Sequence, residues 1–174
     1  MKNKIPLVFV LGLVIINLLS NSCKKDANSN IPHLLTSGTW QLATIQVTTY
    51  LGDATTSTFT LNDSCKQTQF FTFNTDNTCT YTNFSCLTQT TSGTWALTQN
   101  RLFLVSDMAV KDTVPGSKNP IRDTITTPFK NTQIATLGVY SLVLQTGDIQ
   151  PNYSPTSKRR IVRYGFIKQK KVSQ

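Results

Sequence analysis

The chain has 174 residues, among them 28 threonines and no glutamate, and its formal net charge is +9. This length suits a single domain, and a Thr-rich composition without Glu favours β-strands, because Thr fits a half-buried pleated surface. The single histidine, His33, and the absence of a Gly-rich phosphate loop argue against a Ser–His–Asp triad and a nucleotide-binding loop.

The first 22 residues have the layout of a secretory signal. Two cations, Lys2 and Lys4, precede an apolar run from 5 to 19, and small polar residues follow. A retained membrane helix is the alternative, but it needs about 20 apolar residues, and this run is shorter. We therefore expect residues 1–22 to be removed on export.

The segment LLSNSCKKDANSN resembles the lipobox of bacterial lipoproteins, in which a small residue precedes a diacylated cysteine. Ser22 and Cys23 match that pattern. The resemblance implies lipid attachment at Cys23 and anchoring to the cell envelope, at the periplasmic or surface face of the outer membrane. Two acyl chains hold a protein firmly without crossing the bilayer. Residues 23–36 are then expected to be a flexible tether, with a helical turn at 32–35, and the domain to span 37–174.

Alternating apolar residues and turn signals predict a series of short strands. In the first strand, 39–50, the apolar residues change parity between Leu42 and Ile45, which predicts a bulge near 43–44. Further strands are expected at 57–61, 69–74, 79–83, 94–98, 101–105, 121–127, 133–136, 140–145 and 158–169. Because an open sheet leaves unpaired edges, we predict an all-β antiparallel up-and-down barrel of about eight strands.

The phrase TSGTWQL at 36–42 returns as TSGTWAL at 91–97, and each copy holds one of the two tryptophans. The first copy resembles the Gly-x-Trp signature of the first lipocalin strand. Cys65 with FFTFNTDNT, Cys86 and SGTWALTQNRLFL resembles the lipocalin-like, calycin-type domains of small secreted lipoproteins of Gram-negative bacteria. We interpret both copies as strand openings, not as a duplicated domain.

The lipocalin resemblance implies two structural features. One is a barrel-end plug, Trp40, beneath a basic residue of the last strand, for which Arg160 and Arg163 are the candidates and Arg163 is preferred. The other is a disulfide between Cys65 and Cys86. Cys79 is then expected to be a buried free thiol. The spacing of the thiols does not match a zinc site, and neither a metal nor another cofactor is expected.

The basic residues are unevenly distributed. Without Lys2 and Lys4, 15 of the 17 basic residues and all 8 acidic residues remain, and the whole excess of positive charge lies in 158–174. Nucleic-acid binding is one interpretation of such a cluster. Export and the alternation of Val162, Tyr164 and Phe166 favour a solvated outer face beside anionic lipid headgroups instead.

Two classes of function are left open, and neither is enzymatic. In the first, a monomeric barrel carries a small apolar ligand in a cavity lined by four aromatic residues: Phe71, Phe73, Tyr81 and Trp95. In the second, the barrel is filled with side chains and the protein is a surface or interaction module without a small ligand. The same residues serve a pocket and a core, so the sequence does not separate these classes.

The phrases VKDTV and IRDTI flank PGSKN and predict a protruding hairpin, with Lys111 and Asp112 facing Arg122 and Asp123. An ordinary long connection is the alternative. Each phrase also contains Asp, Thr and an apolar residue in succession, which resembles the O-glycosylation signal of some Gram-negative bacteria. The resemblance implies glycans at Thr113 and Thr124.

Overall fold

The computed structural model describes residues 30–61, 65–113 and 121–169, with the backbone alone at 113 and 121–124. One short helix, α2 (Ile31–Thr36), precedes the first strand. The strands are β1 (Thr39–Leu51), β2 (Ala54–Thr60), β3 (Phe70–Phe73), β4 (Thr78–Thr82), β5 (Thr90–Leu97), β6 (Phe103–Ser106), β7 (Val110–Thr113), β8 (Ile121–Thr126), β9 (Thr132–Leu137), β10 (Ser141–Gly147) and β11 (Lys158–Lys168), with a 3-10 turn, η2 (Phe84–Cys86), between β4 and β5.

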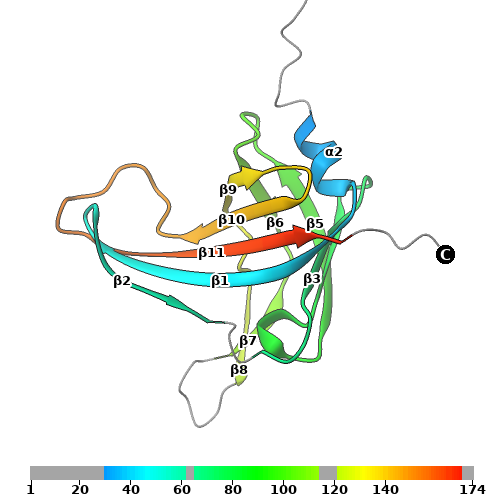
Figure 1. The fold of residues 1–174 in the computed structure, drawn as a ribbon, viewed down its shortest axis with the longest axis horizontal. Coiled ribbons are helices and arrows are strands. Elements are labelled where there is room, and N and C mark those ends of the chain that lie inside the picture. The colour runs from blue at the N-terminus through cyan, green and yellow to red at the C-terminus, as the bar shows by residue number, and fades with distance from the viewer. Residues whose placement is uncertain (1–29, 62–64, 114–120, 170–174) are drawn as a thin grey trace, which may run out of the picture. The chain divides into compact units, whose positions relative to one another are not determined.

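Eight of these strands close into an antiparallel barrel (Figure 1). The order around it is β1, β3, β4, β5, β6, β9, β10 and β11, and β11 pairs with β1 to complete the ring. The predicted fold class is therefore confirmed. Closure pairs the edges that an open sheet would expose.

The first strand, β1, is long enough to belong both to the barrel and to a sheet that extends beyond it. Its first residues pair with β3 and its later residues with β2, while β11 runs along nearly its whole length. A shift in register between Leu42 and Thr44 confirms the predicted bulge. The bulge changes which parity faces inward, so Trp40 and Val47 are both buried. Beyond the barrel, β1, β2 and β11 continue as a curved arm (Figure 1).

The barrel has two distinct ends. The end called the α2 end here carries α2 and the turns β3–β4, β5–β6 and β9–β10. The predicted turn at Asn77 is present there, with φ at 64°. The other end, called the disulfide end, carries η2 and the β7–β8 hairpin.

Two expected boundaries differ from the structure at the α2 end and in β5. The domain begins at Ile31 instead of residue 37, because α2 buries Leu35 completely against the barrel. The strand β5 begins at Thr90 instead of residue 94, since Thr90–Ser92 pair with β4. The second TSGTW copy therefore lies inside a strand, and only the first copy opens one.

The predicted hairpin is present as β7 and β8, but its register differs from the expected one. Lys111 lies opposite Ile125, and Asp112 accepts a hydrogen bond from Ser85 of η2 at 2.5 Å. Lys111 therefore does not face a charged residue of β8, which corrects that part of the predicted register, and the side chains of Arg122 and Asp123 lie outside the described part. Among the described residues, no helix is long and apolar enough to span a bilayer.

Candidate functional site at the disulfide end

The disulfide fixes the loop before β3 to η2. Cys65 and Cys86 are bonded, with Cα atoms 5.7 Å apart, which confirms the predicted pairing. Cys79 is a buried free thiol, as predicted, and its Sγ lies 3.4 Å from Ser106 Oγ. Burial raises the pKa of the Cys79 thiol. The sulfur chemistry of the described residues is therefore a cross-link at the disulfide end and a separate protonated thiol near the start of β4, next to the β3–β4 turn.

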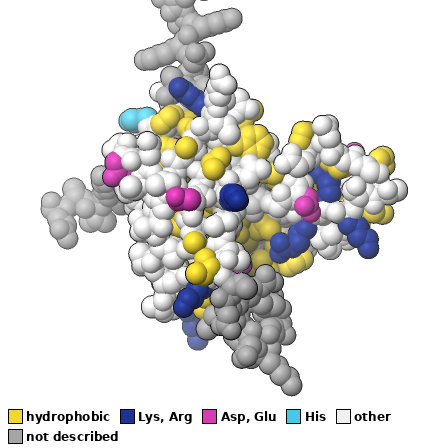
Figure 2. All heavy atoms as spheres, turned by 180° about the vertical axis from the view of Figure 1, so that it is seen from behind, with side chains coloured by type: hydrophobic (Ala, Val, Ile, Leu, Met, Phe, Trp, Pro, Cys, Tyr) yellow, Lys and Arg dark blue, Asp and Glu magenta, His cyan; other side chains and the backbone are white. Residues whose placement is uncertain are grey.

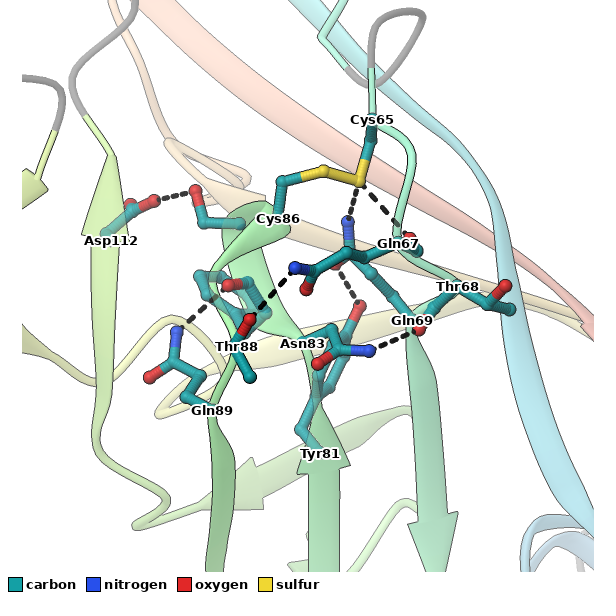
Figure 3. Close-up of a disulfide and its surroundings, with 12 residues drawn as sticks. Cys65, Gln67, Thr68, Gln69, Tyr81, Asn83, Cys86, Thr88, Gln89 and Asp112 are labelled. Atoms are coloured by element: carbon teal, nitrogen blue, oxygen red, sulfur yellow. Dashed lines mark hydrogen bonds between the residues drawn. A yellow bond between two sulfur atoms is a disulfide. The ribbon is translucent and has the colours of Figure 1, made fainter.

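Gln89 connects the hairpin to η2, and Figure 3 shows its side chain reaching toward η2. Its amide nitrogen donates to the backbone oxygens of Lys111 and Phe84, at 2.7 and 2.9 Å. Its amide oxygen accepts from the Lys111 backbone nitrogen at 3.1 Å. The Gln89 side chain thus pairs with the outer edge of β7 as a neighbouring strand would. Together with the hydrogen bond from Ser85 to Asp112, it fixes the position of β7 at the base of the hairpin, which is called the hairpin root below.

A second set of polar contacts joins the loop before β3 to the rest of this end (Figure 3). Gln67 donates to Thr88 at 2.9 Å, and Asn83 donates to the backbone oxygen of Thr68 at 2.9 Å. The buried Gln69 accepts from the Tyr81 hydroxyl at 3.2 Å. Burial also raises the pKa of Tyr81 well above its usual value, so this phenol is neutral and acts as a donor.

A groove of about 490 Å³ lies between the hairpin root and the segment that follows η2. Its surface is mainly apolar, and Ile125 at its side is 66% exposed. Its lining consists of Leu87, Thr88, Gln89, Thr91, Ala109, Val110, Lys111 and Ile125. The volume is in the range of small-molecule sites, which are mostly apolar with a few polar groups. Lys111 adds a cation to it, so an apolar ligand with an acidic group fits this chemistry.

The four aromatic residues predicted to line a cavity are brought together inside the barrel. Ring centroids lie 4.1 Å apart for Phe71 and Phe73, 5.1 Å for Phe71 and Tyr81, and 5.5 Å for Phe73 and Trp95. All four are at most 5% exposed. These side chains therefore pack on one another in the manner of a core.

A residue that sequence reasoning missed, Phe129, completes this packing. It enters from the segment between β8 and β9 and is fully buried. Its ring centroid lies 4.9 Å from that of Phe71, 5.9 Å from that of Tyr81 and 5.2 Å from that of Tyr164. A loop residue has no alternation to mark it as inward-facing, and the preceding Pro128 signals only a turn.

The barrel-end plug needs one correction. Trp40 is fully buried, and its Nε1 donates to the backbone oxygen of Leu35 in α2 at 2.8 Å. The cation above its ring is Lys168, whose Nζ lies 5.7 Å from the ring centroid. Arg163 is instead exposed, opposite Gln46, because it has the parity that faces outward in β11. Arg160 is exposed as well and pairs with Thr49.

Other predicted sites lie outside the described residues. Cys23 is one of them. Thr113 and Thr124 belong to β7 and β8, but their side chains are outside the described part, so O-glycosylation stays a prediction. Among the residues that the structure does describe, no three His, Cys, Asp or Glu side chains are grouped to hold a metal ion.

The chain matches a known family model. The family model described as "Domain of unknown function (DUF5004)" matches residues 23–150. The match includes the disulfide, the aromatic cluster and the groove, and it ends before β11. No curated protein matches the chain.

Proposed function

This chain belongs to the DUF5004 family, and we propose that it is a lipid-anchored, lipocalin-like binding protein of the cell envelope. Its ligand is small and apolar with an acidic group, and it binds in the groove at the disulfide end. The observation that carries the proposal is the mainly apolar groove of about 490 Å³ beside Lys111.

The anchoring part of the proposal rests on sequence. Ser22 and Cys23 follow an apolar run, and the family match begins at residue 23, the first residue of the expected mature chain. The lipocalin-like part is supported by the closed antiparallel barrel with Trp40 at one end.

The groove is a better candidate than the barrel interior because the interior is occupied by side chains. A ligand between Phe71 and Tyr164 would have to displace Phe129, whose ring contacts both. Removing a buried Phe typically costs about 3–5 kcal/mol. Binding in the groove needs no such displacement.

The proposal assigns binding without a catalytic step. The residues that line the groove include no histidine, cysteine or acidic side chain. The sole histidine, His33, is exposed on α2, at the end opposite the groove.

Two fluorescent probes test the binding site on the purified, natively processed protein. One is anionic, 1-anilinonaphthalene-8-sulfonate, and the other is its neutral relative N-phenyl-1-naphthylamine. We expect Ile125→Ser to lower the affinity for both probes several-fold. Lys111→Ala should lower the affinity for the anionic probe alone. Leu51→Ser is the matched control, because Leu51 is also an exposed aliphatic residue, at 44%, but lies on the arm.

Other outcomes of this experiment would correct the proposal. If Phe129→Ala strengthens binding while Ile125→Ser has no effect, the interior is the site. If neither probe binds the wild-type protein, and native mass spectrometry finds no co-purified small molecule, the filled barrel is an interaction module without a small ligand. Intact mass tests the anchor separately, since an unmodified Cys23 would contradict it.

A further inference from the structure

Several large hydrophobic side chains are exposed at the α2 end. They form what we call the α2-end patch: Leu102, Val139, Tyr140 and Ile167, between 48% and 67% exposed. Tyr140 and Ile167 are neighbours, since Lys168 donates its backbone N–H to Tyr140 at 3.0 Å and Ile167 pairs with Ser141. Leu102 lies on the next turn, where its carbonyl accepts from Ile134 of β9 at 2.8 Å.

The helix at this end adds further apolar surface. Ile31 is only partly buried, and Figure 2 shows hydrophobic side chains near the histidine that α2 carries. Solvent-exposed apolar side chains that occur singly need no explanation, but several on one end of a domain mark an interaction surface.

Charge around this end is asymmetric. Lys168 lies beside Tyr140, and Arg101 directly precedes Leu102 on the β5–β6 turn. The acidic Asp76 is on the β3–β4 turn, across the barrel from the β9–β10 turn that carries Val139 and Tyr140. The apolar side of this end is therefore cationic, as an anionic surface would require.

The chain itself limits what can lie against this patch. Cys23 precedes Asn30, the first described residue, by seven residues. Seven residues reach at most about 25 Å even when fully extended. Any membrane that holds Cys23 is therefore within that distance of the start of α2, which belongs to the same end of the barrel as the patch.

We propose that the α2-end patch docks on the surface of an anionic lipid bilayer, and this inference rests on the proposed lipid anchor. The side chains of Val139, Tyr140 and Ile167 enter the interfacial region of the bilayer, and the positive charges of Arg101 and Lys168 beside them attract acidic headgroups. Each such cation contributes roughly fivefold to affinity for an anionic surface. A second copy of the chain is a poorer occupant, because it would bring the same cations against each other.

The docked orientation has a functional consequence. With the α2 end on the membrane, the groove at the disulfide end faces away from the bilayer. A ligand then enters the groove from the aqueous side, and the hairpin is free to contact it. Docking of the α2-end patch thus leaves the opposite end of the barrel available for binding.

Hydrogen–deuterium exchange on the acylated protein tests the docking. The protein is reconstituted on vesicles of phosphatidylcholine, with or without phosphatidylglycerol, and compared with the same protein in detergent. We expect exchange at 137–142 and 165–168 to slow several-fold on the anionic vesicles, while exchange at 110–113 is unchanged. High salt should reduce this protection. Tyr140→Asp should abolish it, and Ile125→Asp, an equally exposed position at the disulfide end, should not.

The outcomes separate the docking from the anchor. Equal exchange at 137–142 on vesicles and in detergent, for a protein whose mass includes acyl chains, would overturn the docking and leave the anchor intact. A mass without acyl chains would contradict the anchor. The same purified protein would then be mixed with preformed anionic vesicles, where binding lost in Tyr140→Asp supports the docking and absence of binding overturns it.

Discussion

The two copies of TSGTW have the same letters but different structural roles. In the first, Gly38 lies just before β1, and Trp40 is sealed beneath α2. In the second, Gly93 lies inside β5, and the Nε1 of Trp95 donates to the backbone oxygen of Asn74 at 3.0 Å. Both indoles are buried and each finds a carbonyl acceptor, as buried Trp side chains usually do.

The glycines show why the roles differ. A Cβ on Gly38 would lie 2.8 Å from Lys168 Cε, the mobile end of a side chain. A Cβ on Gly93 would lie 2.7 Å from Met108 Cα and 2.8 Å from Met108 N, where the backbone passes close to β5. Gly38 is therefore approached by a side chain, whereas Gly93 is approached by a main chain. The two copies have the same local sequence, so the sequence does not reveal this difference.

The largest expected effect is at the tryptophans. Trp40→Ala should reduce the free energy of unfolding by about 3–5 kcal/mol, because it opens a fully buried site and leaves the Leu35 carbonyl of α2 without its donor. Trp95→Ala should reduce the free energy of unfolding by a smaller amount, since Trp95 is 5% exposed and lies near the turn at Asn74. Urea denaturation of both variants measures the difference. Equal losses would mean that the two copies are energetically equivalent.

The glycine pair should give the next largest difference. We expect Gly93→Ala to destabilise the fold by about 1–3 kcal/mol, because the Met108 backbone has to move. Gly38→Ala should cost clearly less, since the Lys168 side chain can rotate away. The denaturation midpoints of the two variants, at unchanged m-value, provide the measurement. A larger loss for Gly38→Ala would show that the position of Lys168 over Trp40 is the tighter constraint.

The smallest expected effect is a pH dependence specific to the second copy. Asp107 accepts hydrogen bonds from the backbone nitrogen and the hydroxyl of Thr94, at 2.5 and 2.9 Å, and these hold its carboxyl pKa below the usual value. Because the folded pKa is lowered, the contact stabilises the fold above about pH 4 and is lost as the pH falls through the folded pKa.

The comparison of threonines isolates this contribution. Thr94→Val should destabilise the protein more at pH 7 than at pH 3, because it removes a hydrogen bond to the ionised Asp107. The hydroxyl of the corresponding Thr39 in the first copy accepts a hydrogen bond from the neutral Thr72 hydroxyl, at 3.4 Å, so Thr39→Val should show no such pH dependence. Thermal unfolding at the two pH values distinguishes them, and a pH-independent Thr94→Val would contradict the role assigned to Asp107.

The residues of the candidate site differ in how far the sequence could indicate them. The parity of Phe71, Phe73 and Tyr81 identifies them as inward-facing, and the disulfide partners follow a recognisable pattern. The groove has no such signal. It exists because Gln89 pairs with the backbone of Lys111, and a side chain that completes a strand edge in this way has no periodicity.

The sequence by itself determined the barrel, because alternation specifies which face of each strand is buried and closure is the general way to pair the edges of such a sheet. It also determined the bulge in β1, since the change of parity between Leu42 and Ile45 needs one extra residue. Both features are local, because residues close together in the sequence specify them.

Only the tertiary structure decided which cation covers Trp40, what fills the barrel and where the second TSGTW copy lies in its strand. The register of β1 against β11 places Lys168, and not Arg163, above the indole. A loop residue, Phe129, occupies the interior, and the passing Met108 backbone makes Gly93 necessary. Each of these outcomes depends on contacts between segments distant in sequence, whose register and approach no local pattern specifies.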